Sequence, residues 1–467
     1  MTAGPISPEA MRRQLAALPA DLADLVGAAD DGLRAALDDV EWSRVAEVRL
    51  VGDGDSHHAS RAAAMSFHRF AGVSAEAVPA LSFVEYAPPR AESARPLVVG
   101  VSASGATPRV LEAVSRARSD GCRTLALTAT PGSPLTAEAD CAVVLPLTAL
   151  ERSPGIRTYQ ASLVGLIATS LRVGEARGAL SRSESDALRA EIRALADAVE
   201  ATRSANRDAY GSVAELVRDA PAQLVLGSGP SHGTALYAAA KLVEGAGVFA
   251  AGQDVEEWWH VERFALPLDL PLFLVAPPGR SHWRAAEVAA AARAQGRRTV
   301  AVVDAADTHV ARHAVAVLRM RGACREELSP LLYHLFAGDV AAALAEMLGR
   351  SPFQTDRPEI GSRVKACLDV LDPVPRAGTE MPFPDALARA VLELACELQH
   401  NAGQDEPASV DASLAEAGFG SLDVVRLMMA VESRFSVRFP AEMVEPRTFR
   451  TARTIAEAIR ILGARPE

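Results

Sequence analysis

Three hydroxyl side chains near residue 100 have the spacing of an anion-binding loop. Residues 98–101 read VVGV, an apolar run typical of a buried parallel strand, and Ser102, Ser104 and Thr107 follow before a helix-like segment that begins at Pro108. Hydroxyl groups and free backbone N–H groups at a helix N-terminus suit a phosphate or another oxyanion. Serine and threonine are also common helix N-caps, so these residues alone leave an ordinary cap as the alternative.

The elements around this loop alternate between strands and helices. After an amphipathic helical segment at 1–39, we expect strands at 46–51, 79–83, 98–101, 124–128 and 141–145, and again at 223–226, 271–276, 299–303 and 315–318. Helices are expected at 108–119, 159–171, 181–217 and 330–348. This alternation predicts right-handed βαβ units in parallel sheets covered by helices on both faces. The matching order of the two series predicts an internal duplication, with chance similarity as the alternative.

The length of 467 residues predicts more than one domain. We expect a helical N-terminal arm at 1–40, a first doubly wound α/β domain at 41–180, bridging helices and a second doubly wound α/β domain at 181–367, a Pro-rich linker at 368–384, and an all-α domain at 385–467.

Composition and charge exclude several classes of function. The net charge of −11 argues against a nucleic-acid partner. No apolar run is long enough to cross a bilayer and the N-terminus lacks the apolar stretch of a signal peptide, so we expect a cytoplasmic protein without a membrane partner. The cysteines lack CxxC or Cys/His spacing, so we expect neither disulfides nor a metal site. Lys241 and Lys365 are the only lysines, and Lys241 lies in a helix pattern that favours a structural role.

Three loops in a fixed order resemble the sugar isomerase (SIS) family. They read GDGDS at 52–56, SASGAT at 102–107 and TATPGSPL at 128–135. The resemblance implies two SIS domains in tandem, the layout of the isomerase half of glucosamine-6-phosphate synthase and of galactosamine-6-phosphate deaminase/isomerase. The second half has PPGRSH at 277–282 in place of SASGAT. This difference resembles the family pattern in which one half binds the ligand and the other half is structural.

The resemblance also implies the residues that contact a sugar phosphate. In the family the S-x-S-G-x-T loop holds the phosphate, and residues of the first loop line the same cleft. By position in the motifs, the phosphate ligands are Ser102, Ser104 and Thr107, with Gly54 and Ser56 beside them.

Catalytic residues follow from two further stretches. ERSPGIRTY at 151–159 resembles the family loop whose glutamate moves a proton between C1 and C2 of the sugar. The resemblance implies that Glu151 has this role. Because Glu151 would lie at the mouth of an apolar sheet, we expect its pKa to be raised. The alternative is a solvated acid paired with Arg152. AGQDVEEWWH at 251–260 resembles AGELKHGP and aligns Glu257 and His260 with it. In the family that histidine reaches the neighbouring subunit, which implies a homodimer; a surface or packing histidine is the alternative.

The C-terminal segment resembles an acyl or peptidyl carrier protein. LAEAGFGSLDVVRL at 414–427 matches the family pattern around the serine that carries 4′-phosphopantetheine, which implies Ser421 at a helix N-terminus and a four-helix domain. A phosphopantetheinyl transferase and acyl- or aminoacyl-loading enzymes would then be partners. A plain helical bundle with Ser421 as an N-cap is the alternative.

Two functions follow from these resemblances. The first is a phosphosugar-handling SIS enzyme of secondary metabolism: an aldose–ketose isomerase, a deaminase, or an enzyme that forms or cleaves a sugar–amine bond. Its ligand is a sugar phosphate or a glycated small molecule, and it works with a phosphopantetheine-tethered substrate. The alternative is a non-catalytic sugar-phosphate-binding scaffold or sensor fused to a carrier that serves other enzymes.

Overall fold

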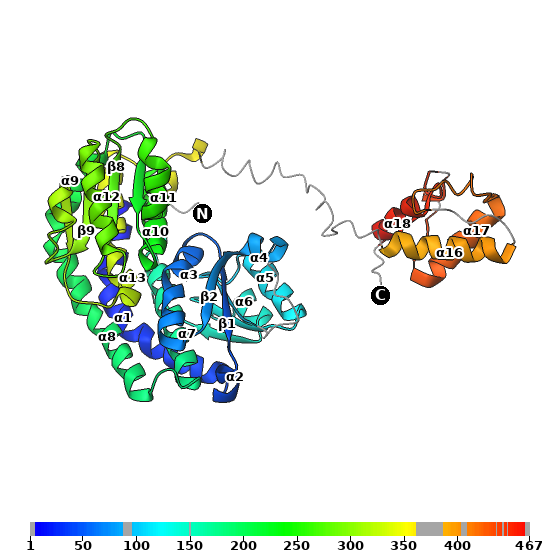
Figure 1. Cartoon of the computed structure of the whole chain (residues 1–467), viewed down its shortest axis with the longest axis horizontal. Helices are drawn as coiled ribbons and strands as arrows, with labels where there is room; N and C mark the ends of the chain where they lie inside the picture. Colours follow the sequence, from blue (N-terminus) through cyan, green and yellow to red (C-terminus); the bar gives the residue numbers. More distant parts are fainter. Residues whose placement is uncertain are drawn as a thin grey trace. The chain divides into compact units, whose positions relative to one another are not determined.

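The chain divides into two compact units, Met1–Cys367 and Leu368–Glu467 (Figure 1). The computed structural model describes residues 5–86, 96–148, 151–360, 386–402, 409–435, 437–440, 443–445 and 447–462. The expected linker at 368–384 and Lys365 lie outside the described residues.

The first sheet of the larger unit has five parallel strands in the order β2-β1-β3-β4-β5. These are β1 (Glu47–Gly52), β2 (Ser74–Pro79), β3 (Leu97–Val101), β4 (Arg123–Thr128) and β5 (Cys141–Val144). All five residues of β3 are buried, as expected for a central parallel strand. The chain runs outward from β1 to β2 and, in the other direction, from β3 to β5. The strand order therefore reverses between β1 and β3.

Helices cover both faces of this sheet. On one face, the core contains residues of α1 (Pro8–Ala36), α3 (Asp55–Ser66) and α7 (Arg157–Ala176) together with Leu50 and Val99. On the other face, α4 (Ala80–Tyr86), α5 (Pro108–Ser119) and α6 (Pro134–Glu138) pack on Val51 and Val98. The short α2 (Asp39–Ser43) and the π-helix η1 (Phe67–Ala71) complete this half.

The second sheet repeats the strand order of the first. Its strands are β6 (Gln223–Leu226), β7 (Ala250–Gln253), β8 (Pro271–Ala276), β9 (Arg298–Asp304) and β10 (Ala316–Met320), arranged β7-β6-β8-β9-β10. The turn after the first strand is also repeated, because Gly54 (φ 53°, ψ −128°) and Gly229 (φ 57°, ψ −128°) have the same conformation. Side chains rarely adopt this positive φ, so glycine is required at both turns.

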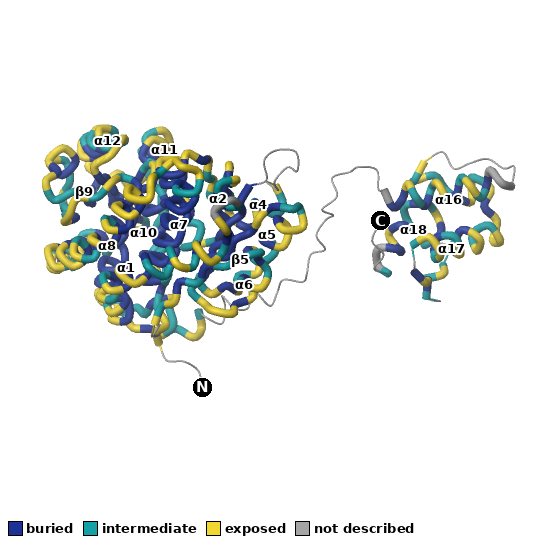
Figure 2. Tube along the Cα trace, turned by 90° about the horizontal axis from the view of Figure 1, so that it is seen from below, coloured by how far each residue is buried: buried dark blue, intermediate teal, exposed yellow. Residues whose placement is uncertain are grey.

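The second half also has helices and short 3-10 turns. They are α8 (Arg182–Ala205), α9 (Arg207–Val217), α10 (Pro230–Ala246), α11 (Val255–His260), α12 (His282–Ala294), α13 (Pro330–Tyr333) and α14 (Leu335–Met347), with the 3-10 turns η2 (Glu262–Phe264), η3 (Ala311–His313), η4 (Glu326–Leu328) and η5 (Pro352–Gln354). Helix α10 packs against α3 of the first half, and Figure 2 shows α7 and α10 as mostly buried.

The N-terminal helix is part of the core and does not extend as an arm. Helix α1 packs against α7, α8 and α14, with Met11, Leu18 and Leu25 buried. Arg157 at the start of α7 donates to Asp21 of α1 at 2.6 and 2.7 Å, and both side chains are nearly covered. The apolar stripe of α1 thus joins the two halves.

Two elements differ from the expectation. The strand expected at 79–83 is wrong: β2 ends at Pro79, and the following residues form α4. Strand β7 was not expected, because its sequence AAGQ has no β-branched or aromatic residue. It pairs only with β6, at the edge of its sheet.

The smaller unit is helical. Its helices α16 (Ala386–Ala402), α17 (Ser421–Phe435) and α18 (Ala452–Ile461) share a core that includes Val391, Leu427 and Ile455. Among the described residues of this unit, these three are the helices longer than one turn, whereas four were expected. No helix in the described parts of the chain is long and apolar enough to span a membrane.

We predict that Gly233→Ala lowers the free energy of unfolding by about 1 to 3 kcal/mol, because an added methyl group overpacks the core. A Cβ at Gly233 of α10 would lie 2.4 Å from the backbone nitrogen of Ala62 and 2.6 Å from the backbone oxygen of His58, both in α3. Urea denaturation followed by circular dichroism measures the change.

Gly27→Ala is the matched control, because a Cβ at Gly27 in α1 has no atom within 4 Å. This substitution should raise the free energy of unfolding slightly, by up to about 1 kcal/mol. Equal midpoints for Gly233→Ala and the wild type would show that the α3–α10 contact is not tight.

Candidate functional site

The structure brings the three predicted hydroxyl groups together at the N-terminus of α5. Ser102 Oγ lies 2.9 Å from Thr107 Oγ1 and 3.5 Å from Ser104 Oγ. The backbone N–H of Gly105 donates to Ser102 Oγ at 3.1 Å, which fixes the loop. Thr107 is the N-cap of α5 but makes no side-chain cap, so N–H groups of the first turn remain available to an anion.

The loop after β1 lies beside this hydroxyl loop. Strands β1 and β3 are adjacent and parallel, with Val51 opposite Gly100, so their carboxyl ends meet at one edge of the sheet. Gly54 is the N-cap of α3 and Ser56 lies in its first turn. Because the strand order reverses between β1 and β3, the two loops flank the position where open α/β sheets bind their ligands. We call this position the β1/β3 crevice.

A buried lysine from the second half approaches the same loop. Lys241 of α10 is fully buried, and its Nζ donates to Asp55 Oδ2 at 2.6 Å and to Glu244 of its own helix. The ammonium group also lies 5.1 Å from the centre of the Tyr237 ring. Asp55 is the first residue of α3, directly after Gly54. The second half therefore supplies a charged group at the edge of the β1/β3 crevice.

The three charged groups of this cluster shift each other's pKa values. Burial alone would raise the pKa of Asp55, but Lys241 and His58 hold it below its ordinary value. Burial and the nearby Asp55 raise the pKa of Glu244, against the opposing effect of Lys241. Burial would lower the pKa of Lys241, but the two carboxylates raise it. Lys241 is thus a protonated cation, and the raised pKa of Glu244 makes this carboxylate a stronger proton acceptor than an ordinary glutamate.

Aromatic rings fix the position of the cluster. Tyr237 stacks on Tyr159 with ring centres 3.7 Å apart, and His334 meets both rings edge-on. Burial lowers the pKa of His334 to about 3, so it is a neutral part of this packing. The Tyr237 hydroxyl donates to the backbone oxygen of Gly155 at 3.2 Å, and a Cβ at Gly155 would lie 2.5 Å from Asp55 Oδ2. The loop before α7 therefore closes against Asp55.

Sequence reasoning missed this cluster and assigned Lys241 a structural role. One signal was available: Lys241 and Glu244 are three residues apart on one face of the helix, within a stretch at 238–246 whose other residues are apolar or glycine. The partner Asp55 is 186 residues away in the chain, and only the packing of α10 on α3 reveals it.

The raised pKa expected for Glu151 is wrong. Its carboxylate is exposed and accepts two hydrogen bonds from Arg13 of α1, at 3.0 and 2.8 Å. This guanidinium holds the pKa of Glu151 below its ordinary value. The backbone oxygen of Glu151 accepts a further bond from Gln14 at 2.9 Å. The alternative expected for Glu151 was a solvated carboxylate paired with Arg152. In the structure the carboxylate is solvated but is paired with Arg13 of α1.

Glu257 and His260 lie on α11 in the second half, and both are exposed. His260 Nε2 is 3.2 Å from Glu256 of the same helix, and Glu256 is paired with Arg284 of α12. The structure therefore places these two residues on an outer surface of this chain, separate from the hydroxyl loop that it assembles at β3.

The second sheet has a corresponding loop after β8, and a carboxylate fills it. The backbone N–H of Arg280 donates to Glu326 Oε1 at 3.2 Å. A Cβ at Gly279 would lie 2.5 Å from the same oxygen. Glu326 thus occupies the position at which a bound anion would meet this loop.

In the smaller unit, Ser421 is the first residue of α17 and is exposed. The backbone N–H of Gly420 donates to Asp423 Oδ2 at 3.0 Å, which fixes the start of the helix. An exposed hydroxyl at the positive end of a 15-residue helix fits a phosphodiester such as that of phosphopantetheine.

Two family models match separate parts of the chain. Residues 44–169 match the SIS domain, and residues 389–459 match the phosphopantetheine attachment site. The chain therefore contains an SIS domain and a C-terminal phosphopantetheine-attachment domain, which indicates a covalently attached 4′-phosphopantetheine. The first match covers the first sheet and the second includes Ser421.

The curated relatives are longer proteins. The isomerizing glutamine–fructose-6-phosphate aminotransferase of Corynebacterium diphtheriae is 25% identical over 347 residues, which are 71% of this chain and 55% of the relative. The enzyme of the same name from Streptomyces coelicolor is 28% identical over 347 residues, 71% of this chain and 56% of the relative. The chain thus spans about half the length of these relatives.

Solved structures share the fold of the larger unit. The C-terminal domain of glucosamine-fructose-6-phosphate aminotransferase from Francisella tularensis has a TM-score of 0.66 at 19% identity, covering 73% of this chain and 96% of that one. Tagatose-6-phosphate ketose/aldose isomerase from Escherichia coli has a TM-score of 0.59 at 17% identity, covering 75% and 97%.

We predict that Lys241→Met lowers the free energy of unfolding at pH 7.5 by about 3 to 5 kcal/mol, because Asp55 and Glu244 lose their cation. The difference in free energy of unfolding between the variant and the wild type should be smaller at pH 5.5. Without Lys241 the pKa of each carboxyl in the folded state rises above its value in the unfolded chain. The folded state then binds protons first, and lower pH stabilises it. Urea unfolding at the two pH values measures this.

Arg13→Met is the control, since it breaks the exposed pair with Glu151 and should leave the free energy of unfolding almost unchanged at both pH values. An equal deficit for Lys241→Met at pH 7.5 and 5.5 would contradict the electrostatic account and leave only lost packing.

Proposed function

We propose that the larger unit binds a sugar phosphate in the β1/β3 crevice and moves a proton between its C1 and C2. The observation that carries this proposal is the buried cluster of Asp55, Lys241 and Glu244 beside an uncapped anion-binding loop. The relatives support the ligand class, because both the curated aminotransferases and the isomerase of similar fold are named for hexose 6-phosphates.

The chemistry divides between a binding loop and a proton-transfer pair. Ser102, Ser104, Thr107 and the N-terminus of α5 hold the phosphate, while Gly54 and Ser56 line the crevice. The carboxylate of Glu244 removes the proton from the carbon next to the substrate carbonyl. The ammonium group of Lys241 faces the carbonyl oxygen and stabilises the negative charge that develops there. The Lys241 ammonium group gives a proton to the carbonyl oxygen and regains one from the neighbouring hydroxyl, so the hydroxyl proton moves from the C2 oxygen to the C1 oxygen through the enediol. The proton on Glu244 returns to the neighbouring carbon, and an aldose and a ketose interconvert with no other reactant.

Asp55 is a positioning residue in this proposal. It holds the Lys241 ammonium group at 2.6 Å and keeps it charged. A protonated lysine donates a hydrogen bond but does not form an imine, so proton transfer fits this arrangement better than deamination or sugar–amine bond formation. Glu151 competes for the role of base only if its two hydrogen bonds to Arg13 are broken.

Glu257 and His260 are proposed to act at the sugar site of a second copy of the chain. Glu257 and His260 are exposed on α11, so a homodimer is the arrangement in which they could reach a sugar bound by the partner. We also propose that the second half is a diverged SIS domain. Its strand order and the conformation of Gly229 support this, and Glu326 explains why it would bind no phosphate of its own.

We propose Ser421 as the attachment point of 4′-phosphopantetheine in the C-terminal domain. When bound, this group supplies a flexible thiol that carries an acyl or aminoacyl group. A carrier in the same chain raises the local concentration of its cargo to about millimolar. The proposed partners are a phosphopantetheinyl transferase and acyl- or aminoacyl-loading enzymes, and such a fusion points to secondary metabolism.

One observation favours a second function, a non-catalytic sugar-phosphate-binding scaffold. Asp55 and Glu244 already take two of the three hydrogen-bond donors of the fully buried Lys241 ammonium group without a ligand. In a scaffold the crevice would bind a sugar phosphate without exchanging its C2 proton, and the carrier domain would act with other enzymes.

We predict that the protein exchanges the C2 proton of glucose 6-phosphate, or the matching C1 proton of fructose 6-phosphate, with solvent deuterium. Glu244→Gln should slow this exchange by about 10²- to 10⁴-fold, the range typical of a lost general base. Glu151→Gln should leave the rate within about twofold. Proton NMR in D₂O measures the exchange.

Loss of exchange in Glu151→Gln but not in Glu244→Gln would move the base to Glu151. Binding without exchange in the wild-type protein would favour the scaffold. Ser102→Ala with Thr107→Ala should weaken substrate binding in either case, which separates the binding loop from the proton-transfer pair.

We predict that incubation with a phosphopantetheinyl transferase and coenzyme A adds one phosphopantetheine group per chain, measured by intact mass spectrometry. Ser421→Ala should abolish the addition, because it removes the exposed nucleophilic hydroxyl. Ser433→Ala, in the last turn of the same helix, is the control and should be modified fully. Unchanged modification of Ser421→Ala would place the attachment at another residue.

A further inference from the structure

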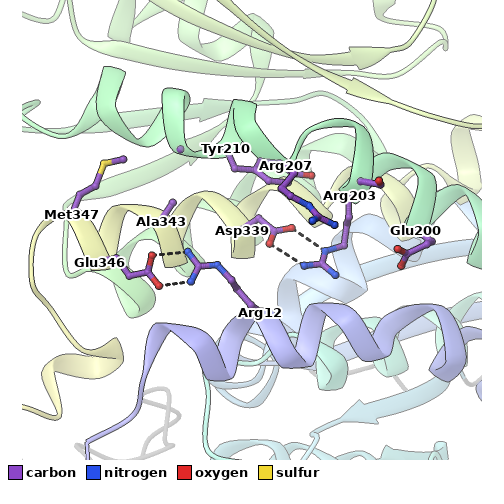
Figure 3. A pocket seen from close by; sticks show the side chains of 11 residues that line it. Arg12, Glu200, Arg203, Arg207, Tyr210, Asp339, Ala343, Glu346 and Met347 are labelled. Carbon is purple, nitrogen blue, oxygen red and sulfur yellow. Dashed lines mark hydrogen bonds and ion pairs between the residues drawn. The ribbon is translucent and has the colours of Figure 1, made fainter.

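A second cavity lies in the larger unit, between α1, α8, α9 and α14. Its volume is about 510 Å³, within the range of small-molecule sites. Figure 3 shows its charged lining: three arginines, Arg12, Arg203 and Arg207, face three carboxylates, Glu200, Asp339 and Glu346. None of the residues assigned to the β1/β3 crevice lines this cavity.

Two of the three arginines are neutralised within the cavity. Arg203 donates to both oxygens of Asp339 at 3.0 and 3.1 Å, and Arg12 is paired with Glu346. Arg207 has no hydrogen bond or ion pair with any residue that the structure describes. Glu200 is the remaining carboxylate, and Figure 3 places it beyond Arg203. The Arg207 end of the cavity is therefore its positive end.

The N-terminus of α9 adds to this positive charge. Asn206 is the N-cap of α9 but makes no cap with its side chain. Its amide is used elsewhere: it donates to the backbone oxygens of Thr202 and Arg319 at 2.8 Å and accepts from the Arg319 N–H at 2.9 Å. The N–H groups of Arg207 and the next two residues therefore lack a side-chain partner at the positive end of an 11-residue helix.

A buried hydroxyl without a partner lines the same cavity. The Tyr210 side chain is 5% exposed, and its hydroxyl has no hydrogen-bond partner among the described residues. An unsatisfied buried hydroxyl is costly, and in native structures it calls for a specific explanation. Tyr210 lies one helical turn after Arg207, on the same face of α9. Both side chains contribute to the cavity lining.

We propose that this cavity is a second anion site that binds a small phosphate ester. Its phosphate is held by the guanidinium of Arg207 and by the N–H groups at the start of α9, and the Tyr210 hydroxyl donates to one of its oxygens. The combination of a cation, helix N–H groups and a hydroxyl suits a tetrahedral oxyanion. Glu200, Asp339 and Glu346 repel additional negative charge, so the cavity favours one phosphate group over a polyanion.

The test is titration of the full-length protein with inorganic phosphate at constant ionic strength, by isothermal calorimetry. Arg207→Gln should remove one binding equivalent, or weaken it about tenfold or more, because a charge-assisted contact is lost. Tyr210→Phe should weaken the same equivalent severalfold. Arg218→Gln, at the C-cap of the same helix and paired with Glu215 and Asp219, is the matched control and should bind like the wild type.

The variant Ser102→Ala with Thr107→Ala separates this site from the proposed phosphate loop of the crevice. In that background one equivalent should remain, and adding Arg207→Gln should abolish it. Glycerol 3-phosphate should bind this remaining site more tightly than inorganic phosphate, since an ester fills more of the cavity. Unchanged phosphate binding in Arg207→Gln, or binding that never saturates, would overturn the proposal whatever happens at the crevice.

Discussion

The close contact between α3 and α10 is the constraint on which the candidate site depends. Gly233 lets the two helix backbones meet without a side chain between them. That approach brings Lys241 of the second half to Asp55 at the start of α3. Neither half holds this pair alone, because the aspartate follows β1 and the lysine lies five strands later in the chain. The two sheets are thus linked at the point where the chemistry is proposed.

The fully buried ammonium group of Lys241 has lost its hydration, and several neighbouring groups offset the cost. Removing a charge from water costs several kcal/mol, which only well-placed partners offset. Asp55 and Glu244 supply the opposite charge, Tyr237 offers its ring face, and the backbone of Gly155 closes against Asp55. The cluster carries two carboxylates for one ammonium, so one of them keeps a raised pKa. That residual imbalance supports the proposed role of Glu244 as a base.

The sequence predicted most of the local structure and the position of the three hydroxyls at a helix N-terminus, because both depend on short-range patterns. The helix at 108–119 and the strands at 223–226 and 271–276 have the expected bounds, and the three hydroxyls of the loop meet. The surroundings of the carboxylates could not be predicted in the same way. Glu151 is paired by Arg13 and Asp55 by Lys241, and both contacts join residues more than 130 positions apart. Local patterns therefore could not show which carboxylate an arginine or lysine neutralises.

The two halves differ in what satisfies their corresponding loops. In the first half, the hydroxyls of Ser102 and Thr107 bond each other and leave the α5 N-terminus uncapped. In the second half, Glu326 supplies an internal carboxylate to the loop at Gly279 and Arg280. A loop with an internal anion gains stability and loses its capacity for a ligand, whereas an uncapped loop retains that capacity at some cost in stability. With one half filled in this way, the other half can retain the open polar groups that a binding site requires.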